Sequence, residues 1–277
     1  MGWCIHKGSR VLTGDFNGDG RADMMCHDDK GNKWVALANA AGQFTGTSWH
    51  KAMGWCGGAN VGLHLGDFNG DGRTDMLCHR RTTGDNWVSL ANADGSFSGT
   101  TWHNKKLKWC GHGGARFLVG DFNGDGRSDM FCYDSKTKWV ALAQPGGSFK
   151  GTSSRVATGW CSHAGSSIYV ADFNGDLRDD LLCHDKAGRN WVMLAGPGGK
   201  LKRHSDWNPS YKWCRGELHL GYLNGDKRAD MLCHRKKDGY KWVAAAGPQG
   251  NLHKHHHLFL DIAISLCLCM HPSRCVL

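Results

Sequence analysis

The sequence predicts an all-β protein, a β-propeller made of five four-stranded blades. The main observation is a unit of about fifty residues that occurs five times, with an acidic loop starting at 15, 67, 121, 172 and 222. Two dipeptides keep the same spacing: Trp-Cys begins at 3, 55, 109, 160 and 213, and Trp-Val at 34, 87, 139, 191 and 242. No segment has sustained helical periodicity, and 40 glycines are typical of short strands joined by turns.

Each unit is expected to contain four short strands, which in the first unit span residues 10–14, 23–27, 33–39 and 43–49. Residues 33–39 alternate as a half-buried strand does, and a turn follows at 40–42. A sheet of this size cannot bury both faces alone, so neighbouring blades must stack on one another. We expect the propeller to span residues 1–252, and residues 253–277 to form an irregular tail, to which we assign no function.

The acidic loop has the pattern of a calcium site. In the first copy, DFNGDGRAD at 15–23, oxygen-bearing side chains stand at positions 1, 3, 5 and 9. A tight loop of this kind can direct several oxygens at one hard cation, and calcium suits such a flexible oxygen cage. A plain acidic turn is the alternative for a single loop, but four complete copies favour calcium. An EF-hand is excluded because position 12 holds cysteine instead of glutamate and because the flanks are typical of strands.

The predicted ligands are the side chains at positions 1, 3, 5 and 9 and the backbone carbonyl of the arginine at position 7. They are Asp15, Asn17, Asp19, Arg21, Asp23, Asp67, Asn69, Asp71, Arg73, Asp75, Asp121, Asn123, Asp125, Arg127, Asp129, Asp172, Asn174, Asp176, Arg178 and Asp180. In the fifth copy Tyr222 replaces the first aspartate and Lys227 replaces a glycine. Asn224, Asp226 and Asp230 remain there, and we expect a weak or absent fifth site.

Ten of the thirteen cysteines follow the repeat, which predicts one disulfide per blade. The expected pairs are Cys4–Cys26, Cys56–Cys78, Cys110–Cys132, Cys161–Cys183 and Cys214–Cys233. An even, periodic set of this kind indicates an oxidising compartment. Two alternatives remain: a bridge to a neighbouring blade, and zinc at the Cys-His dipeptides. Zinc is less favoured because adjacent strand residues point to opposite faces.

These units resemble FG-GAP/VCBS repeats, the calcium-bearing blades of the integrin α-chain propeller, and are similar to the propeller lectins built from the same repeat. The resemblance covers residues 3 to 250 and is carried by the acidic loop between the first two strands. It implies that calcium stiffens the blade and does not touch ligand, and that sugars bind in pockets between blades. Those propellers have seven blades, whereas this chain shows five; we expect a small closed ring of five blades here, and a fragment of a seven-bladed ring is the alternative.

Charge and hydropathy exclude some partner classes. The net charge is +9, but the basic residues are scattered, which favours a solvated surface over a groove for nucleic acid. The first four residues lack the features of a signal peptide and repeat Met53–Cys56, so we expect the chain to start within the pattern. The longest apolar run, near residues 258–270, is too short to span a membrane.

The sequence indicates a binding protein. It contains no nucleophile elbow, phosphate loop or dinucleotide fingerprint, and we do not expect an enzyme. Three tryptophans fall outside the regular sets, and we expect a sugar to stack on them beside histidine; the alternative is packing between blades. These candidates are Trp49, His50, Trp102, His103 and Trp207. The predicted function is that of a secreted, calcium-stabilised lectin. The rival is a structural or adhesion protein that binds extracellular proteins or itself.

Overall fold

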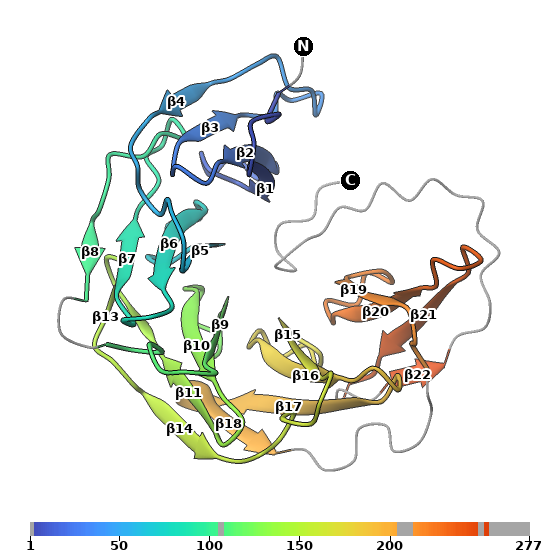
Figure 1. Ribbon diagram of the computed structural model, residues 1–277. Helices are drawn as coiled ribbons and strands as arrows, with labels where there is room; N and C mark the ends of the chain where they lie inside the picture. The colour runs from blue at the N-terminus through green and yellow to red at the C-terminus, as the bar shows by residue number, and fades with distance from the viewer. Residues whose placement is uncertain (1–2, 105–107, 204–212, 249–251, 255–277) are drawn as a thin grey trace.

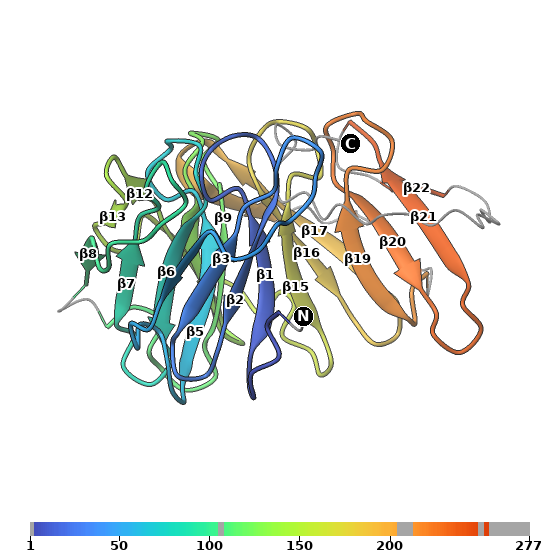
Figure 2. The same ribbon diagram turned by 90° about the horizontal axis from the view of Figure 1, so that it is seen from above.

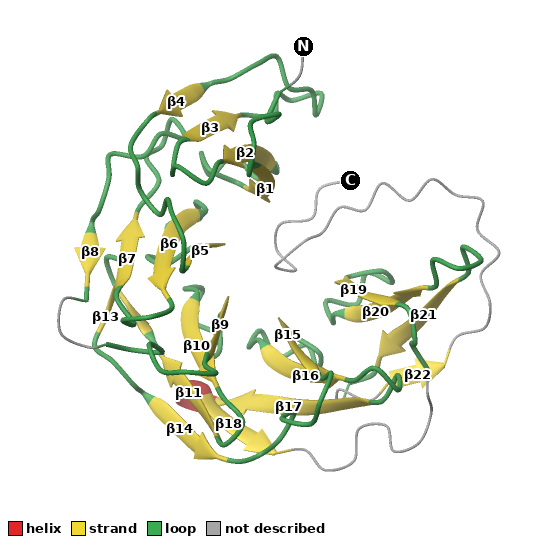
Figure 3. Cartoon of the chain, viewed as in Figure 1, coloured by secondary structure: helices red, strands yellow, loops and turns green. Residues whose placement is uncertain are grey.

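The computed structural model describes residues 3–104, 108–203, 213–248 and 252–254, and these form five four-stranded antiparallel sheets. Figure 1 shows the sheets arranged like blades around an axis, with the first strand of each blade innermost. Figure 3 shows strands and connecting loops almost throughout; the exception is one 3₁₀ turn at Pro197–Gly199. The all-β propeller with five four-stranded blades is therefore confirmed.

The blades are equivalent, and their strands follow one another in chain order from the inside outward. The innermost strands are β1 (Arg10–Gly14), β5 (Val61–Gly66), β9 (Arg116–Gly120), β15 (Ser167–Ala171) and β19 (Glu217–Gly221). The second strands are β2 (Asp23–His27), β6 (Asp75–Arg80), β10 (Asp129–Tyr133), β16 (Asp180–His184) and β20 (Asp230–His234). The third strands are β3 (Lys33–Ala36), β7 (Asn86–Ser89), β11 (Thr137–Ala141), β17 (Asn190–Gly196) and β21 (Lys241–Ala246). The outer strands are β4 (Trp49–Lys51), β8 (Trp102–His103), β14 (Ser154–Ala157), β18 (Lys200–Arg203) and β22 (Leu252–Lys254).

The first two predicted strands of blade one have the observed bounds, but the last two do not. The third strand ends at Ala36 and the fourth begins only at Trp49. Between them the chain turns back on itself through an isolated bridge from Ala38 to Phe44, because the N–H of Ala38 donates to the buried carboxylate of Asp23 at 2.8 Å. In blade three the same turn is a small hairpin of β12 (Ala143–Gln144) and β13 (Ser148–Phe149).

The five blades form an open arc. In Figure 1 the blade of β1–β4 and the blade of β19–β22 lie at the two ends of the arc and do not pack together, and Figure 2 shows the same blades from above. The described residues therefore do not form the closed five-bladed ring considered above. The first and last blades each have one face without a neighbouring blade of the described chain.

The hydrophobic core lies between successive blades. Met25 and Val35 of blade one pack with Leu63 and Met76 of blade two, and similar clusters join the later pairs. The phenylalanine at position 2 of each acidic loop is fully buried in four blades: Phe16, Phe68, Phe122 and Phe173. In blade five Leu223 takes this position and is 39% exposed, because no blade among the described residues packs against it.

Five disulfides join the loop before each innermost strand to the second strand of the same blade, in the predicted pairing. Both cysteines of each unit are therefore used within one blade, which removes a bridge between blades and zinc at the Cys-His dipeptides as alternatives. Such bridges are typical of oxidising compartments. No helix among the described residues is long and apolar enough to cross a membrane.

Candidate functional site

The acidic loop between the first two strands of a blade is organised around two buried aspartates. In the first copy, the carboxylate of Asp15 accepts the N–H groups of Gly18 at 2.7 Å and Gly20 at 2.9 Å. The carboxylate of Asp23, fully buried, accepts the N–H of Phe16 at 2.9 Å. These hydrogen bonds fix the backbone shape of the loop, while no three carboxylates of this fully described loop lie within 4.8 Å of one another.

The same contacts recur in the other loops. Asp67, Asp121 and Asp172 each accept N–H groups of their own loop. Asp75, Asp129, Asp180 and Asp230 each bind two backbone N–H groups. Loop five keeps the second anchor but has Tyr222 in place of the first, so its fold does not depend on the missing carboxylate.

The arginine at position 7 has a contact that the sequence prediction did not include. The guanidinium of Arg21 forms an ion pair with Asp19, and its Nε donates to the carbonyl of Ala38 at 3.0 Å. The ion pair recurs in all five loops. The arginine therefore ties the loop to the end of the third strand. The predicted ligand atom of this residue is its backbone carbonyl, and that role remains a prediction.

Ionisation of the buried aspartates at position 9 is energetically unfavourable. Burial, followed by the nearby carboxylates of the same loop, raises the pKa of Asp23 to about 6, of Asp75 to about 7 and of Asp129 to about 8. A bound cation would offset both causes. The donor set of each complete loop is three carboxylates, an amide oxygen and a backbone carbonyl, and this all-oxygen set fits calcium.

Successive loops are hydrogen-bonded to one another. The N–H of Thr74, in loop two, donates to the carbonyl of Asp15, and the hydroxyl of Thr74 accepts the N–H of Asp15 at 3.0 Å. Equivalent bonds run from Ser128 to Asp67, from Asp179 to Asp121 and from Ala229 to Asp172. The first residue of each of the first four loops is therefore fixed by the next blade.

The sequence-predicted tryptophan sites are partly buried by neighbouring rings. Trp49 packs against Phe97 of blade two with ring centroids 5.7 Å apart, and Trp102 packs in the same way against Phe149 of blade three at 5.4 Å. Each therefore contributes to packing between blades. Trp207 lies outside the described residues.

His50 and His103 stack on the Trp-Val tryptophans instead. His50 lies 4.8 Å from the ring of Trp34, and His103 lies 4.7 Å from the ring of Trp87. Both tryptophans are half-buried. The tryptophans of the Trp-Val set at 34 and 87 therefore have polar side chains as neighbours.

Blades three and four carry a more complete arrangement, which we call the Trp139 cluster and the Trp191 cluster. In the Trp139 cluster, the ring of His112 lies edge-on to Trp139 at 5.3 Å, and its Nε2 is 3.1 Å from the carboxylate of Asp134. His112 remains 44% exposed.

The Trp191 cluster repeats this geometry and adds a cation. His163 lies edge-on to Trp191 at 5.1 Å and 3.4 Å from the carboxylate of Asp185. Arg189 lies over the ring of Trp191 at 5.3 Å and donates from Nε to Asp185 at 2.7 Å. Although burial acts in the opposite direction, the N–H and guanidinium of Arg189 lower the pKa of Asp185. The side chain of Asp185 is only 3% exposed, so the cluster presents the partly exposed ring of Trp191 beside the imidazole and guanidinium that this carboxylate holds in place.

The Trp191 cluster adjoins a cleft between blades four and five. The cleft has a volume of about 400 Å³ and is lined by Asp185 and His184 of blade four and by Arg215 and Gly216 of blade five, among others. A sequence signal for the clusters exists in the Cys-x-His motif, which occurs within the repeat at residues 4–6, 110–112 and 161–163. The motif alone does not predict the clusters, because the contact with the tryptophan forms only in the folded blade.

The fold and the repeated acidic loop define a β-propeller whose blades each carry an aspartate-rich loop between the first two strands. The chain belongs to the family of FG-GAP-like repeat proteins, whose pattern it matches over residues 15–78, 67–132 and 121–183. No curated protein sequence matches it.

Several solved propellers are similar in fold. A lectin from Agrocybe aegerita, described as recognising non-reducing terminal N-acetylglucosamine, has a TM-score of 0.66 at 22% identity, over 89% of this chain and 65% of that one. The chain thus spans just under two thirds of that lectin. The BP39L lectin of Burkholderia pseudomallei has a TM-score of 0.56 at 16% identity, over 90% of this chain and 69% of that one. The periplasmic gluconolactonase PpgL of Pseudomonas aeruginosa has a TM-score of 0.53 at 14% identity, over 88% and 68%. At these identities the likeness is one of fold.

Proposed function

We propose that this protein is a secreted carbohydrate-binding propeller in which sugars bind at the Trp139 and Trp191 clusters, beside the junctions between blades. The observation that carries the proposal is the geometry of these two clusters. Each places a partly exposed tryptophan ring next to an imidazole that a carboxylate holds in place. The apolar ring stacks on the C–H face of a sugar, while the exposed imidazole of His112 or His163 bonds its hydroxyl rim.

The repeat multiplies this site. Two clusters on one rigid arc, with further tryptophan–histidine stacks at Trp34 and Trp87, would give avidity toward a branched glycan from weak single contacts. The similarity to two lectins supports this class of ligand, and the five disulfides support secretion. Lactonases share the fold as well, but the clusters contain no activated nucleophile, and we propose a non-catalytic role.

Calcium, in this proposal, acts on stability and not on the sugar. The acidic loops and the clusters lie at opposite ends of the second strand: Asp129 begins β10 and Asp134 directly follows it, while Asp180 begins β16 and Asp185 directly follows it. Calcium would neutralise the buried carboxylates and stiffen the blade that presents the cluster.

The test is binding of the calcium-loaded, oxidised protein to a glycan array, starting with glycans that end in N-acetylglucosamine. We expect Trp139→Ala and Trp191→Ala together to abolish binding without loss of the native near-UV circular dichroism. A double variant at Trp49 and Trp102 is the comparison. If only that variant loses binding, the site lies at those residues; if the well-folded wild type binds no glycan, the lectin proposal is wrong and a protein-binding role takes its place.

A further inference from the structure

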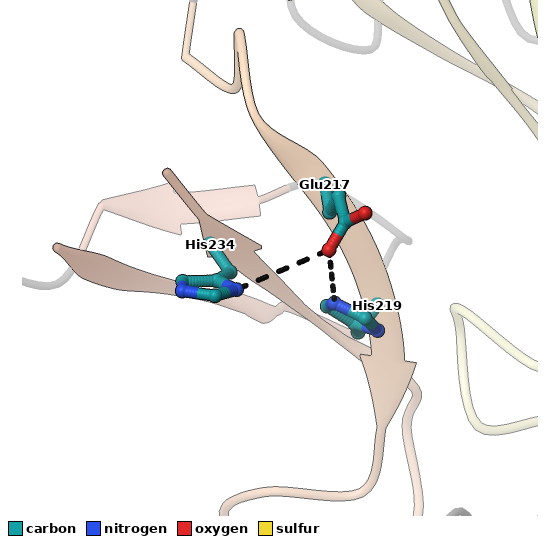
Figure 4. A group of neighbouring side chains, drawn as sticks. All are labelled: Glu217, His219 and His234. Carbon is teal, nitrogen blue, oxygen red and sulfur yellow. Dashed lines mark ion pairs between the residues drawn. The ribbon is translucent and has the colours of Figure 1, made fainter. Parts of the chain in front are cut away.

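Blade five carries a group of side chains that no other blade has. Figure 4 shows Glu217 and His219 of β19 and His234 of β20 pointing toward one another. One carboxylate oxygen of Glu217, Oε2, lies 4.0 Å from Nε2 of His219 and 4.0 Å from Nδ1 of His234. All three atoms lie within 4.8 Å of one another, and this is the one such group of three found among the described residues.

The strand register explains why the three side chains meet. Glu217 and His219 are two residues apart on one strand and so share a face of the sheet. Glu217 is paired directly with His234 on the neighbouring strand, so the side chain of His234 lies on that same face. The group therefore depends on the sheet itself and not on a loop.

This face of blade five is the uncovered one. Leu218 and Leu220, which alternate with the group, pack against Phe173 and Leu182 of blade four. The group must therefore point away from blade four, toward the open end of the arc. The side chains of His219 and His234 are 34% and 31% exposed, so an ion from solution can reach them.

Blade two provides an internal comparison. His64 and His79 stand at the positions of His219 and His234, and Gly62 stands at the position of Glu217. Both histidines there pack on the ring of Phe117 of the next blade, at 4.7 and 4.4 Å. In blade five no described ring covers the pair, and a carboxylate replaces the glycine.

We propose that Glu217, His219 and His234 form a binding site for a zinc-class divalent ion on the end face of blade five. Two imidazoles and one carboxylate are a donor set that zinc accepts, with a further position open to water. Calcium is disfavoured because two of the three donors are nitrogens. The second oxygen of Glu217 accepts from Lys236 at 2.5 Å, which orients the carboxylate.

The three side chains already face one another, but their ligand atoms are farther apart than in a site with zinc bound. Bonds of about 2.0–2.2 Å in a tetrahedral arrangement bring ligand atoms to about 3.3–3.6 Å from one another. Two of the observed separations are 4.0 Å and the third is at most 4.8 Å, and rotation of the exposed side chains can close the difference.

The experiment is calorimetric titration of zinc into the full chain with calcium in excess, so that the acidic loops do not compete. The sequence also has His253 in β22, and histidines at 255–257 and cysteines at 267, 269 and 275 that lie outside the described residues. A background variant in which these histidines are alanine and these cysteines are serine removes that competing donor set. In this background we expect one zinc per chain, and visible absorption bands of a nitrogen-ligated ion when cobalt is used instead.

Single substitutions then test the assignment. We expect His219→Ala, His234→Ala and Glu217→Gln each to weaken zinc binding at least about tenfold, with unchanged near-UV circular dichroism. Leu223→Ala, an exposed change at the same end of the arc, is the matched control and should keep the affinity. The proposal is overturned if the background variant binds no zinc, or if His219→Ala with His234→Ala leaves affinity and cobalt spectrum unchanged.

Discussion

Lys33 carries a buried charge, whereas the equivalent residue in two other blades is uncharged. Its ammonium, fully buried on β3, donates to the carbonyl of Gly31 at 2.9 Å and to that of Trp55. Burial lowers the pKa of Lys33 to about 7. Beside it, Nδ1 of His27 is buried without a hydrogen-bond partner, and burial, followed by the charge of Lys33, lowers the pKa of this histidine to about 4.

Blades two and four have asparagine in place of this lysine. There, Nδ1 of His79 lies 2.8 Å from Oδ1 of Asn86, and Nδ1 of His184 lies 2.8 Å from Oδ1 of Asn190. The side-chain amide of Asn86 also donates to a backbone carbonyl two residues earlier. Asparagine thus satisfies the histidine and one of the carbonyls that the lysine contacts, without a buried charge.

We predict that Lys33→Asn stabilises the protein at pH 6. A partner for the buried nitrogen of His27 contributes about 1–3 kcal/mol. The carbonyl of Trp55 loses its donor in exchange, so we expect a net gain of about 1–2 kcal/mol in the free energy of unfolding.

The pH dependence gives a second signature. Between the folded pKa of about 7 and the unfolded value of 10.5, the unfolded state holds more protons on Lys33. The stability of the wild type therefore rises with pH in this window, by about 1.4 kcal/mol per pH unit, and the cost of the buried charge is fully present below pH 7. The difference between Lys33→Asn and the wild type should accordingly fall by about 2–3 kcal/mol from pH 7 to pH 9, so that the wild type becomes the more stable protein by pH 9.

Urea unfolding of both proteins at pH 6, 7 and 9, with calcium present and disulfides intact, measures both effects as differences from the wild type. Lys33→Met is the control, because it removes the charge but gives His27 no partner. It should lose the pH dependence of Lys33 without the full gain at pH 6. The reasoning fails if Lys33→Asn is less stable than the wild type at pH 6 and the difference between them does not change up to pH 9.

Three further predictions concern the core, the bridges and the ion. Phe122→Ala should lower the free energy of unfolding by about 3–5 kcal/mol because its ring is fully buried. Leu223→Ala, at the equivalent but exposed position, should lower it by about 0.5 kcal/mol or less. Equal urea midpoints for the two variants would contradict the open arc. Serine at both Cys110 and Cys132 should remove about 3 kcal/mol, and an unchanged midpoint would mean that the bridge is not formed. Chelation with EGTA should lower the melting temperature of the wild type, and added calcium should restore it. A melting temperature that neither treatment changes would show that calcium does not stabilise the protein.

The repeat allowed the architecture to be predicted from the sequence because its clearest motifs involve residues that are close together along the chain. Strand β2 begins at the last aspartate of the loop, and both were visible in the sequence. The end of β3 was not, because it is set by the hydrogen bond from Ala38 to Asp23, across the blade. The side-chain contacts of Arg21 and the Trp139 cluster could not be predicted from the sequence for the same reason. Each depends on residues that only the folded sheet brings together. Spacing alone also could not decide between an arc and a ring.

The hydrogen bonds between successive loops predict that a substitution in one loop also destabilises the next blade. The carboxylate of Asp121 accepts the N–H groups of Gly124 and Gly126 at 2.8 Å each, while its backbone is bonded at both N–H and C=O to Asp179 of blade four. Asp121→Ala removes the bonds that hold loop three in shape and so frees the backbone to which blade four is attached. We therefore expect faster hydrogen exchange in β15 and β16 of blade four, as well as in blade three, with β1 and β2 unchanged. Exchange that accelerates only within loop three would show that the loops are independent, and calcium would then stiffen single blades instead of the stack.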